Sequence, residues 1–382
     1  MPEGTPAGLT LAGDEIDGAF EPGFLLYGVP IGSDKYCTYQ LNKIAKRIVS
    51  DAQQTVQLLS TERQALWSSL RSSIAQRFDY WLQLCYPSVV KPVAAWLDSE
   101  IWKVLESATG LTIPRGPTDD HWSCVLPVPV VGREGRSFQE WVVRQPVRFG
   151  GFGLQSLEDT ANIAFIGALE QAIPAFTNIC PQLSNVFGGE DFFGPEADPE
   201  VRWRAMLESG CREGTELKSV WSLLQQEAHQ AADWLGEERQ EHFSQNVEGV
   251  GGSSTDGSTR GRLLEKRDTT RSKCITKGLD SHTRQDRTNR PVWSWLQRDK
   301  LSSAWLQALP GPDSSLTSAE FSEAAAAALC LPSPACKERL GQTVRGRQVV
   351  DLYGENVLCA SLPGDHFRKR HDSYKMRMFQ MC

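Results

Sequence analysis

Apolar residues recur at helical spacing through residues 34–112. Each of three successive stretches places them three or four positions apart, which is the spacing of one helix face. The stretches run from Leu41 to Val56, from Trp67 to Trp81 and from Val93 to Leu105. The helices are expected to start at Ser33-Asp34, at Ser60 or Thr61, and after Pro92. Because three apolar stripes close only against each other or a neighbouring domain, this segment is predicted to form a three-helix bundle.

A short apolar run precedes the first of these helices. Phe24 to Tyr27 places four apolar residues in a row before a turn rich in glycine, which predicts a short buried strand. The residues before this run, from Met1 to Pro22, are Gly-rich and predict no strand.

A second candidate strand, Glu140 to Phe149, is interrupted by Pro146 and leads into the turn Gly150 to Gly153. A helix is expected from Ser156, where Asp159 completes a pattern similar to a capping box. Glycines before a helix can let backbone N–H groups approach a phosphate. The spacing matches neither the dinucleotide fingerprint nor the P-loop, so a packing turn is favoured.

The predicted fold is mainly α, with helical bundles, a few short strands and a small C-terminal segment. The expected divisions are 1–33, strand and turn; 34–112, helical bundle; 113–180, loop, Gly-rich turn and helix; 181–248, acidic helices; 249–259, linker; 260–332, basic and Trp-rich helices; and 333–382, C-terminal segment. No repeat of fixed period is visible.

Charge is distributed unevenly along the chain. The net charge of −7 argues against a protein whose whole surface coats nucleic acid. Residues 190–248 contain fourteen acidic and five basic residues, whereas residues 258–300 contain twelve basic and five acidic residues. This division has two interpretations, a nucleic-acid-binding face or two helical segments that attract each other, and the second is the more general one.

Composition indicates a soluble, intracellular protein. The hydrophobic content of 40% and the twelve tryptophans are typical of a globular chain. The N-terminal residues have neither the basic stretch nor the apolar core of a secretory signal, and no apolar run is long enough to cross a membrane. Ten scattered cysteines are therefore expected to be reduced thiols, most of them in the core.

The C-terminal segment collects cysteine, histidine and basic residues. Thiolates and imidazoles in a short, loop-rich segment are what tetrahedral zinc requires. The step from Cys330 to Cys336 is wider than usual for zinc, and Cys330 ends an apolar helix, where a core thiol is expected. The run Arg368 to His371 is instead suited to phosphate, or is a solvated helix start.

The sequence contains no independent enzyme site. None of the familiar catalytic signatures occurs in it, and the one suggestive run is Asp119-Asp120-His121. The Asp-Asp-His run lies in a loop rich in Pro and Gly, without a second group to complete a site, and is interpreted as a solvated turn.

Several segments stand in the same order as in a known family. Leu26 to Asp34 resembles the last palm strand and following turn in reverse transcriptases of non-LTR retrotransposons. Gln145 to Ser156 resembles an Arg- and Gly-rich element further along these polyproteins. Ser302 to Pro310 and Phe321 to Pro332 resemble a later block, and Asp351 to Asp372 resembles the knuckle that closes many of them. The order of these motifs, over nearly the whole chain, carries the resemblance.

The resemblance implies that residues 34–112 occupy the place of the thumb. This family holds two Mg²⁺ ions with an Asp-Asp pair after an apolar strand, which would lie before residue 23. The segment before residue 23 has carboxylates but no such pair, and Asp119-Asp120 lies downstream without the strand. We therefore expect a non-catalytic fragment of a retroelement reverse transcriptase, without polymerase activity.

The resemblance also implies contacts with an RNA or DNA duplex. A thumb grips template and primer through the backbone, which requires Lys and Arg more than base-reading groups. The candidate contacts are Lys43, Lys46, Arg47, Arg260, Arg262, Lys266, Arg267, Arg271, Lys273, Arg368, Lys369 and Arg370. In the knuckle, Asn356 replaces a zinc-binding His of the family, so a zinc ion would rest on Cys336, Cys359 and His371. No other cofactor is expected.

Two other interpretations stay open. The chain could be a helical scaffold or protein-interaction module in which the acidic segment 190–248 docks on the basic segment 258–300 and no nucleic acid is bound. It could also be a decayed copy of a genomic element with no selected function. Backbone binding differs from the scaffold in its salt behaviour, because it weakens as ionic strength rises.

Overall fold

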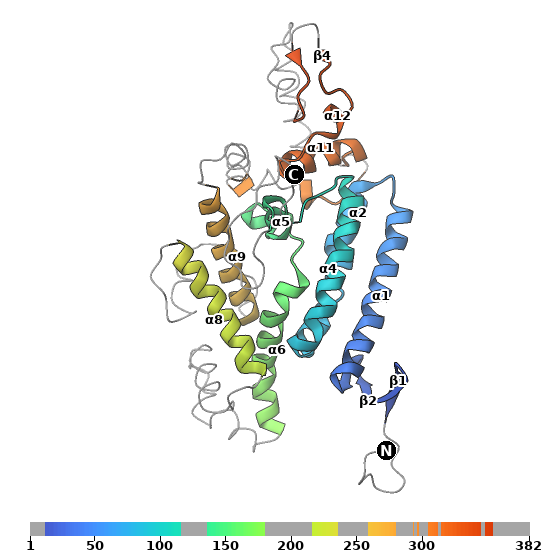
Figure 1. The fold of residues 1–382 in the computed structure, drawn as a ribbon, viewed down its shortest axis with the longest axis vertical. Helices are drawn as coiled ribbons and strands as arrows, with labels where there is room; N and C mark the ends of the chain where they lie inside the picture. Colours follow the sequence, from blue (N-terminus) through green and yellow to red (C-terminus); the bar gives the residue numbers. More distant parts are fainter. Residues whose placement is uncertain are drawn as a thin grey trace.

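The computed structural model describes residues 12–115, 136–179, 216–235, 259–279, 293, 296–297, 305–311, 315–344 and 348–353. This part of the chain is mainly helical and contains two small antiparallel sheets, which confirms the predicted fold class (Figure 1). Most of the predicted linker lies outside the described residues, and Thr259 at its end already belongs to a helix.

The helices α1 (Asp34–Leu58) and α4 (Pro87–Thr109) lie side by side at the centre of the predicted bundle (Figure 1). The Ser33 hydroxyl starts α1 by accepting a hydrogen bond from the Tyr36 amide at 3.2 Å. Helix α4 ends at Gly110, whose φ of 69° lets the chain leave the last turn.

The second and third predicted helices differ from the observed ones. The second is divided into α2 (Arg63–Ser69), a π-helical turn η1 (Leu70–Ile74) and α3 (Asp79–Leu84). Two tryptophans near the ends of this segment bond to different parts of the chain. The Trp67 indole donates to the Leu306 carbonyl, and the Trp81 indole donates to the Gly28 carbonyl. Helix α4 starts at Pro87, earlier than predicted, because a proline suits the first turn, and it continues through Pro92.

The N-terminal strand belongs to a three-stranded antiparallel sheet. Strands β1 (Gly13–Ile16), β2 (Ala19–Leu26) and β3 (Val29–Gly32) are joined by the two-residue turns Asp17-Gly18 and Tyr27-Gly28. All four turn residues have positive φ, the geometry that closes tight hairpins. The prediction of no strand before Pro22 is therefore wrong, because these turns pair the strands locally.

The predicted burial of the run Phe24 to Tyr27 is also wrong. Phe24, Leu25 and Leu26 are about half exposed, and Tyr27 is 90% exposed. The sheet contacts α1 at Gly23, where any Cβ would collide with the Tyr36 ring. Contact at this glycine brings the strand close to the helix while leaving the large apolar side chains of β2 in solvent.

The candidate strand Glu140 to Phe149 is a helix followed by a 3-10 turn. Helix α5 (Phe138–Arg144) starts where the Ser137 hydroxyl accepts from the Glu140 amide at 3.0 Å, and η2 (Val147–Phe149) follows. Every residue of α5 is buried. A short segment buried on all sides has no clear apolar period, which explains why the sequence pattern failed here.

A second group of helices covers α3 and α4. Helix α6 (Leu157–Ile179) packs against both of them and against α9 (Thr259–Gly278). The Ser156 hydroxyl accepts from the Asp159 amide, which confirms the predicted start of α6. Helix α8 (Glu216–Leu235) lies along α9, so the described parts of the acidic and basic segments pack on each other (Figure 1).

The C-terminal part of the described chain packs on the end of α2. Helix α11 (Ser318–Ala328) begins with a capping box formed by Thr317 and Glu320. A short helix, α12 (Pro334–Lys337), and the paired strands β4 (Thr343–Val344) and β5 (Gln348–Val349) follow. The Ser318 hydroxyl donates to the Thr61 carbonyl, which joins the start of α11 to the segment just before α2.

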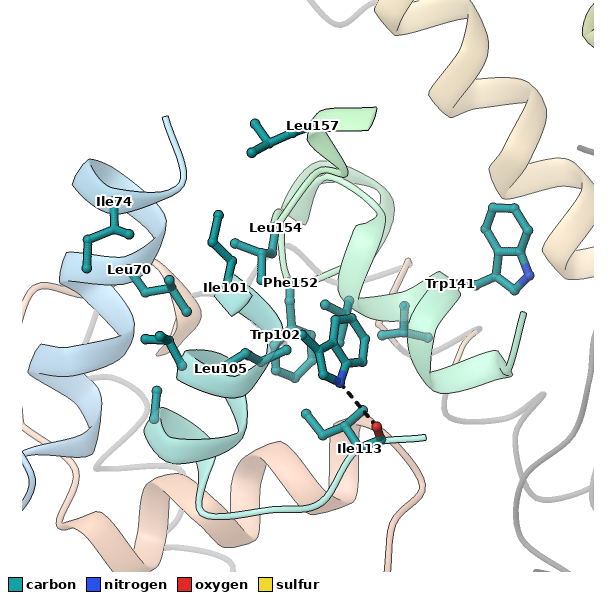
Figure 2. Close-up of a cluster of buried hydrophobic side chains, with 14 of the residues drawn as sticks. Leu70, Ile74, Ile101, Trp102, Leu105, Ile113, Trp141, Phe152, Leu154 and Leu157 are labelled. Carbon is teal, nitrogen blue, oxygen red and sulfur yellow. Dashed lines mark hydrogen bonds between the residues drawn. The ribbon is translucent and has the colours of Figure 1, made fainter. Parts of the chain in front are cut away.

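One apolar core connects these layers. The ring of Phe152 makes edge-to-face contacts with Trp67 at 5.7 Å and with Trp305 at 5.9 Å, and Trp305 contacts Phe321. Figure 2 shows Phe152 close to Leu154 and to Ile101 and Trp102 of α4. The Trp102 indole donates to the Ile113 carbonyl at 3.2 Å, so this buried N–H is satisfied. The Gly-rich turn that carries Phe152 is therefore held inside the core.

Candidate nucleic-acid interface

Three predicted nucleic-acid contacts lie together on the α1 basic face, which we define as Lys43, Lys46 and Arg47. All three side chains are exposed, and spacings of three and four positions place them on one side of the helix. The Lys43 ammonium lies 4.1 Å from the centre of the Tyr39 ring, a cation–π contact that does not neutralise its charge. None of the three forms an ion pair with any residue that the structure describes.

Several other surface cations are neutralised by carboxylates. Lys35 lies 3.6 Å from both Asp17 and Glu21. Arg77 pairs with Asp51 and Lys103 with Glu100, each at 2.6 Å. The α1 basic face therefore differs from these positions in having no carboxylate partner of its own.

The predicted contacts on α9 are divided between the interior and the surface. Arg271 pairs with Asp159 at 3.3 Å, and Arg267 pairs with Asp268 at 3.0 Å, with both arginine side chains at most 10% exposed. Arg260 is partly buried and pairs with Asp79. Arg271, Arg267 and Arg260 thus serve contacts within the protein. Arg262 and Lys273 are exposed and Lys266 is half-buried, and each of them also takes part in an interaction within the chain.

Arg271 belongs to a buried ionic cluster that joins α4, α5, α6 and α9. Each side chain of the cluster is at most 10% exposed. Its members are Asp98, Arg136, Glu140, Arg144, Asp159 and Arg271. Arg136 donates two hydrogen bonds to Asp159, at 2.8 and 3.0 Å. Each charge in the cluster has an opposite charge beside it, so removing one partner would leave a buried charge unpaired at the junction of the four helices.

The pKa directions follow from this packing. Burial lowers the pKa of Arg271 to about 10, and the neighbouring Arg267 acts in the same direction. Burial also opposes the charge of Arg136, but Asp159 and Glu140 outweigh it and raise the pKa of Arg136. On α8, burial raises the pKa of Glu227 although Arg271 lowers it.

The cluster contains residues that the sequence analysis did not single out. Arg136, Glu140 and Arg144 stand four positions apart, with alternating charge, and form ion pairs; Arg136 lies just before α5 and the other two lie within it. Such spacing is a signal of helix and would have contradicted the strand predicted there. Their partner Asp98 is followed in α4 by Ser99 and Glu100, and the local sequence does not distinguish it as a buried carboxylate.

The Gly-rich turn uses its backbone N–H groups internally. The amides of Gly150, Gly151, Phe152 and Gly153 bond to carbonyls of Val147, Pro146, Val142 and Gln145, respectively. The Asp98 carboxylate accepts from the Leu157 amide at 3.0 Å and from the Glu158 amide at 3.2 Å, so a protein carboxylate occupies the start of α6. The packing interpretation of this turn agrees with both observations.

The predicted zinc ligands are only partly described. Cys336 lies in α12 with intermediate exposure, whereas Cys359 and His371 lie outside the described residues, as do Arg368, Lys369 and Arg370. Within the described ranges, no group of three or more His, Cys, Asp or Glu side chains is placed to hold a metal. Cys330 is buried, as expected for a core thiol.

Comparison of the chain with protein-family models, with curated proteins and with solved structures finds no match. The reverse transcriptase resemblance stays a prediction from motif order. Among the helices that the structure describes, none combines the length and apolar character that crossing a membrane requires.

Proposed function

We propose that this protein binds the sugar–phosphate backbone of a nucleic-acid duplex through the α1 basic face. The observation that supports this most is the exposure of Lys43, Lys46 and Arg47 on one side of α1, without carboxylate partners in the described chain. Phosphate binding requires clustered cations and no base-reading side chains. The proposal moves the main contact from the basic helix α9 to α1, because three of the α9 arginines serve internal ion pairs.

The size of the face sets the expected strength and salt dependence. Three phosphate contacts predict that the logarithm of the association constant falls with the logarithm of salt concentration with a slope of about −2.7 on B-form DNA. Binding of this kind is weak and independent of sequence, with dissociation constants of roughly 10⁻⁴ to 10⁻⁶ M at physiological salt.

The experiment measures binding of a labelled duplex by fluorescence anisotropy at low and rising salt. The variant K43Q/K46Q/R47Q is compared with K35Q/R77Q/K103Q, which removes the same total charge from cations that have carboxylate partners. We expect the first variant to lose most of the binding and the second to keep most of it. Equal losses in the two variants, or no binding by the unchanged protein at low salt, would contradict the proposal.

We further propose, from the resemblance, that this chain does not polymerise nucleotides and is part of a retroelement reverse transcriptase. The resemblance covers the thumb-like bundle and later segments but no Asp-Asp pair after an apolar strand. Template-dependent primer extension with Mg²⁺ or Mn²⁺ tests this. Synthesis that depends on both template and protein would overturn it.

A scaffold function is the second candidate, and the packing of α8 against α9 favours it. In that case the acidic and basic segments exist to hold each other, and the protein presents helical surfaces to partners. The anisotropy experiment separates the two candidates. Absence of duplex binding at low ionic strength would overturn the binding proposal, and the scaffold would survive it.

A further inference from the structure

A cavity of about 570 Å³ lies between α3, the Gly-rich turn and the starts of α6 and α9. Three arginines and one carboxylate line it, together with amide and hydroxyl groups. The charged residues are Arg71, Arg148, Arg260 and Asp79. Its volume is in the range of small-molecule sites, and the balance of its charged lining is positive.

Arg71 is the member of this lining without a carboxylate partner. Its side chain is half-buried, and the guanidinium donates to the Leu306 carbonyl at 3.3 Å. Within the described residues it forms no ion pair. Burial lowers the pKa of Arg71, with no carboxylate acting in the opposite direction. A half-buried guanidinium of this kind gains from an added anion, because arginine stays charged.

Gly153 lies beside the Arg71 guanidinium. Its φ is +81°, and a Cβ at this position would lie 3.4 Å from Arg71 Nε and 3.1 Å from a methyl group of Val147. A side chain at this position would strain the backbone and press on Val147, and it would be in van der Waals contact with Arg71. The Gly-rich turn therefore lies directly beside the Arg71 side chain.

The other two arginines that line the cavity are already paired. Arg260 pairs with Asp79, and Arg148 pairs with Glu265 while 54% exposed. Gly167 allows α6 and α9 to pack closely at Arg260, because a Cβ on Gly167 would lie 3.0 Å from the Arg260 Cα. Arg148 and Arg260 are therefore held near Arg71 by separate elements, η2 and α9.

We propose that this cavity binds a phosphate monoester, with Arg71 as the central contact and Arg148 and Arg260 at its rim. Planar guanidinium groups match the oxygens of a phosphate and bind it with charge-assisted hydrogen bonds. The site is separate from the α1 basic face, and its existence does not depend on the proposed duplex binding.

The test is the melting temperature of the full chain, with inorganic phosphate as the probe and chloride at matched ionic strength as the reference. We expect a saturable rise in melting temperature with phosphate, because a ligand of the folded state stabilises it. In R71M the phosphate dependence should be lost, with binding weakened roughly 10- to 100-fold. The matched control R77M changes an exposed arginine, paired with Asp51, and should keep the full response.

Two results would overturn the proposal. One is a melting temperature of the unchanged protein that responds equally to phosphate and chloride. The other is an R71M variant that still folds and responds to phosphate as strongly as R77M. The first result requires no variant and holds even if R71M does not fold.

The source of the phosphate is distinguished by three further probes. These are a nucleoside 5′-monophosphate, an oligonucleotide with a 5′-phosphate and the same oligonucleotide with a 5′-hydroxyl. Tighter binding of the 5′-phosphorylated strand, lost in R71M but kept in K43Q/K46Q/R47Q, indicates a strand end. Equal binding of all phosphate monoesters indicates a small metabolite. If R71M binds every probe as R77M does, the proposal fails while duplex binding through α1 is unaffected.

Discussion

Helices α1 and α9 use their basic residues in opposite ways. On α1, Lys43, Lys46 and Arg47 face solvent without a described carboxylate partner. On α9, Arg267 and Arg271 point inward to Asp268 and Asp159. The difference teaches that the count of basic residues does not identify a phosphate-binding face. The position of the nearest carboxylates decides which cations are available to a ligand.

The largest expected effect is on the internal side of this comparison, in the variant D98A. Asp98 pairs with Arg144 at 3.3 Å and caps the start of α6. Its removal leaves Arg144 buried, with only the more distant Glu140 beside it. We expect a loss of about 3–5 kcal/mol in the free energy of unfolding, measured by urea denaturation.

The matched control for D98A is D51A, which removes the partner of Arg77 from an exposed ion pair. This control should cost less than about 1 kcal/mol. A D98A loss as small as that of D51A would mean that the buried ionic cluster does not hold the helices together.

A smaller effect is expected at Glu227, on the side of α8 that meets α9. Burial raises the pKa of Glu227 above its ordinary value of 4.5, despite the nearby Arg271. The folded state therefore favours the protonated carboxyl. This contribution to stability is fully present below pH 4.5 and is lost as the pH rises through the folded-state pKa.

Because the folded state raises the pKa of Glu227, E227Q should have the same free energy of unfolding as the unchanged protein at low pH. At pH 7 it should be more stable, by no more than about 1 kcal/mol. Thermal unfolding at several pH values measures the difference. If E227Q is instead less stable at pH 7, attraction between acidic and basic helices drives their packing, and the scaffold interpretation gains support.

The errors of sequence interpretation have physical reasons of the same kind. The start of α1 at Ser33 was predictable because capping is local. The strand expected at Glu140 to Phe149 was wrong because a fully buried segment shows no period, and its charges pair with each other along one helix. The sheet before Pro22 was missed although Asp17-Gly18 is a hairpin signal.

The site could be predicted only in part. Lys43, Lys46 and Arg47 were named as candidate contacts on the first helix, and the structure shows all three exposed. The inward direction of Arg271 could not be predicted, because its partner Asp159 lies 112 positions earlier in the chain. Arg71 was not singled out, since a lone arginine followed by two serines carries no signal of the cavity that it lines.

The smallest effect on stability is expected on the exposed side of the comparison. Since no described carboxylate depends on the α1 basic face, K43Q/K46Q/R47Q should change the free energy of unfolding by less than about 0.5 kcal/mol. R271Q removes a single positive charge but leaves Asp159 with one guanidinium fewer, so it should cost about 1–3 kcal/mol. Urea denaturation of both variants measures the contrast. If the triple variant proves as costly as R271Q, the α1 cations serve the fold, and a loss of duplex binding in that variant would no longer identify them as the binding face.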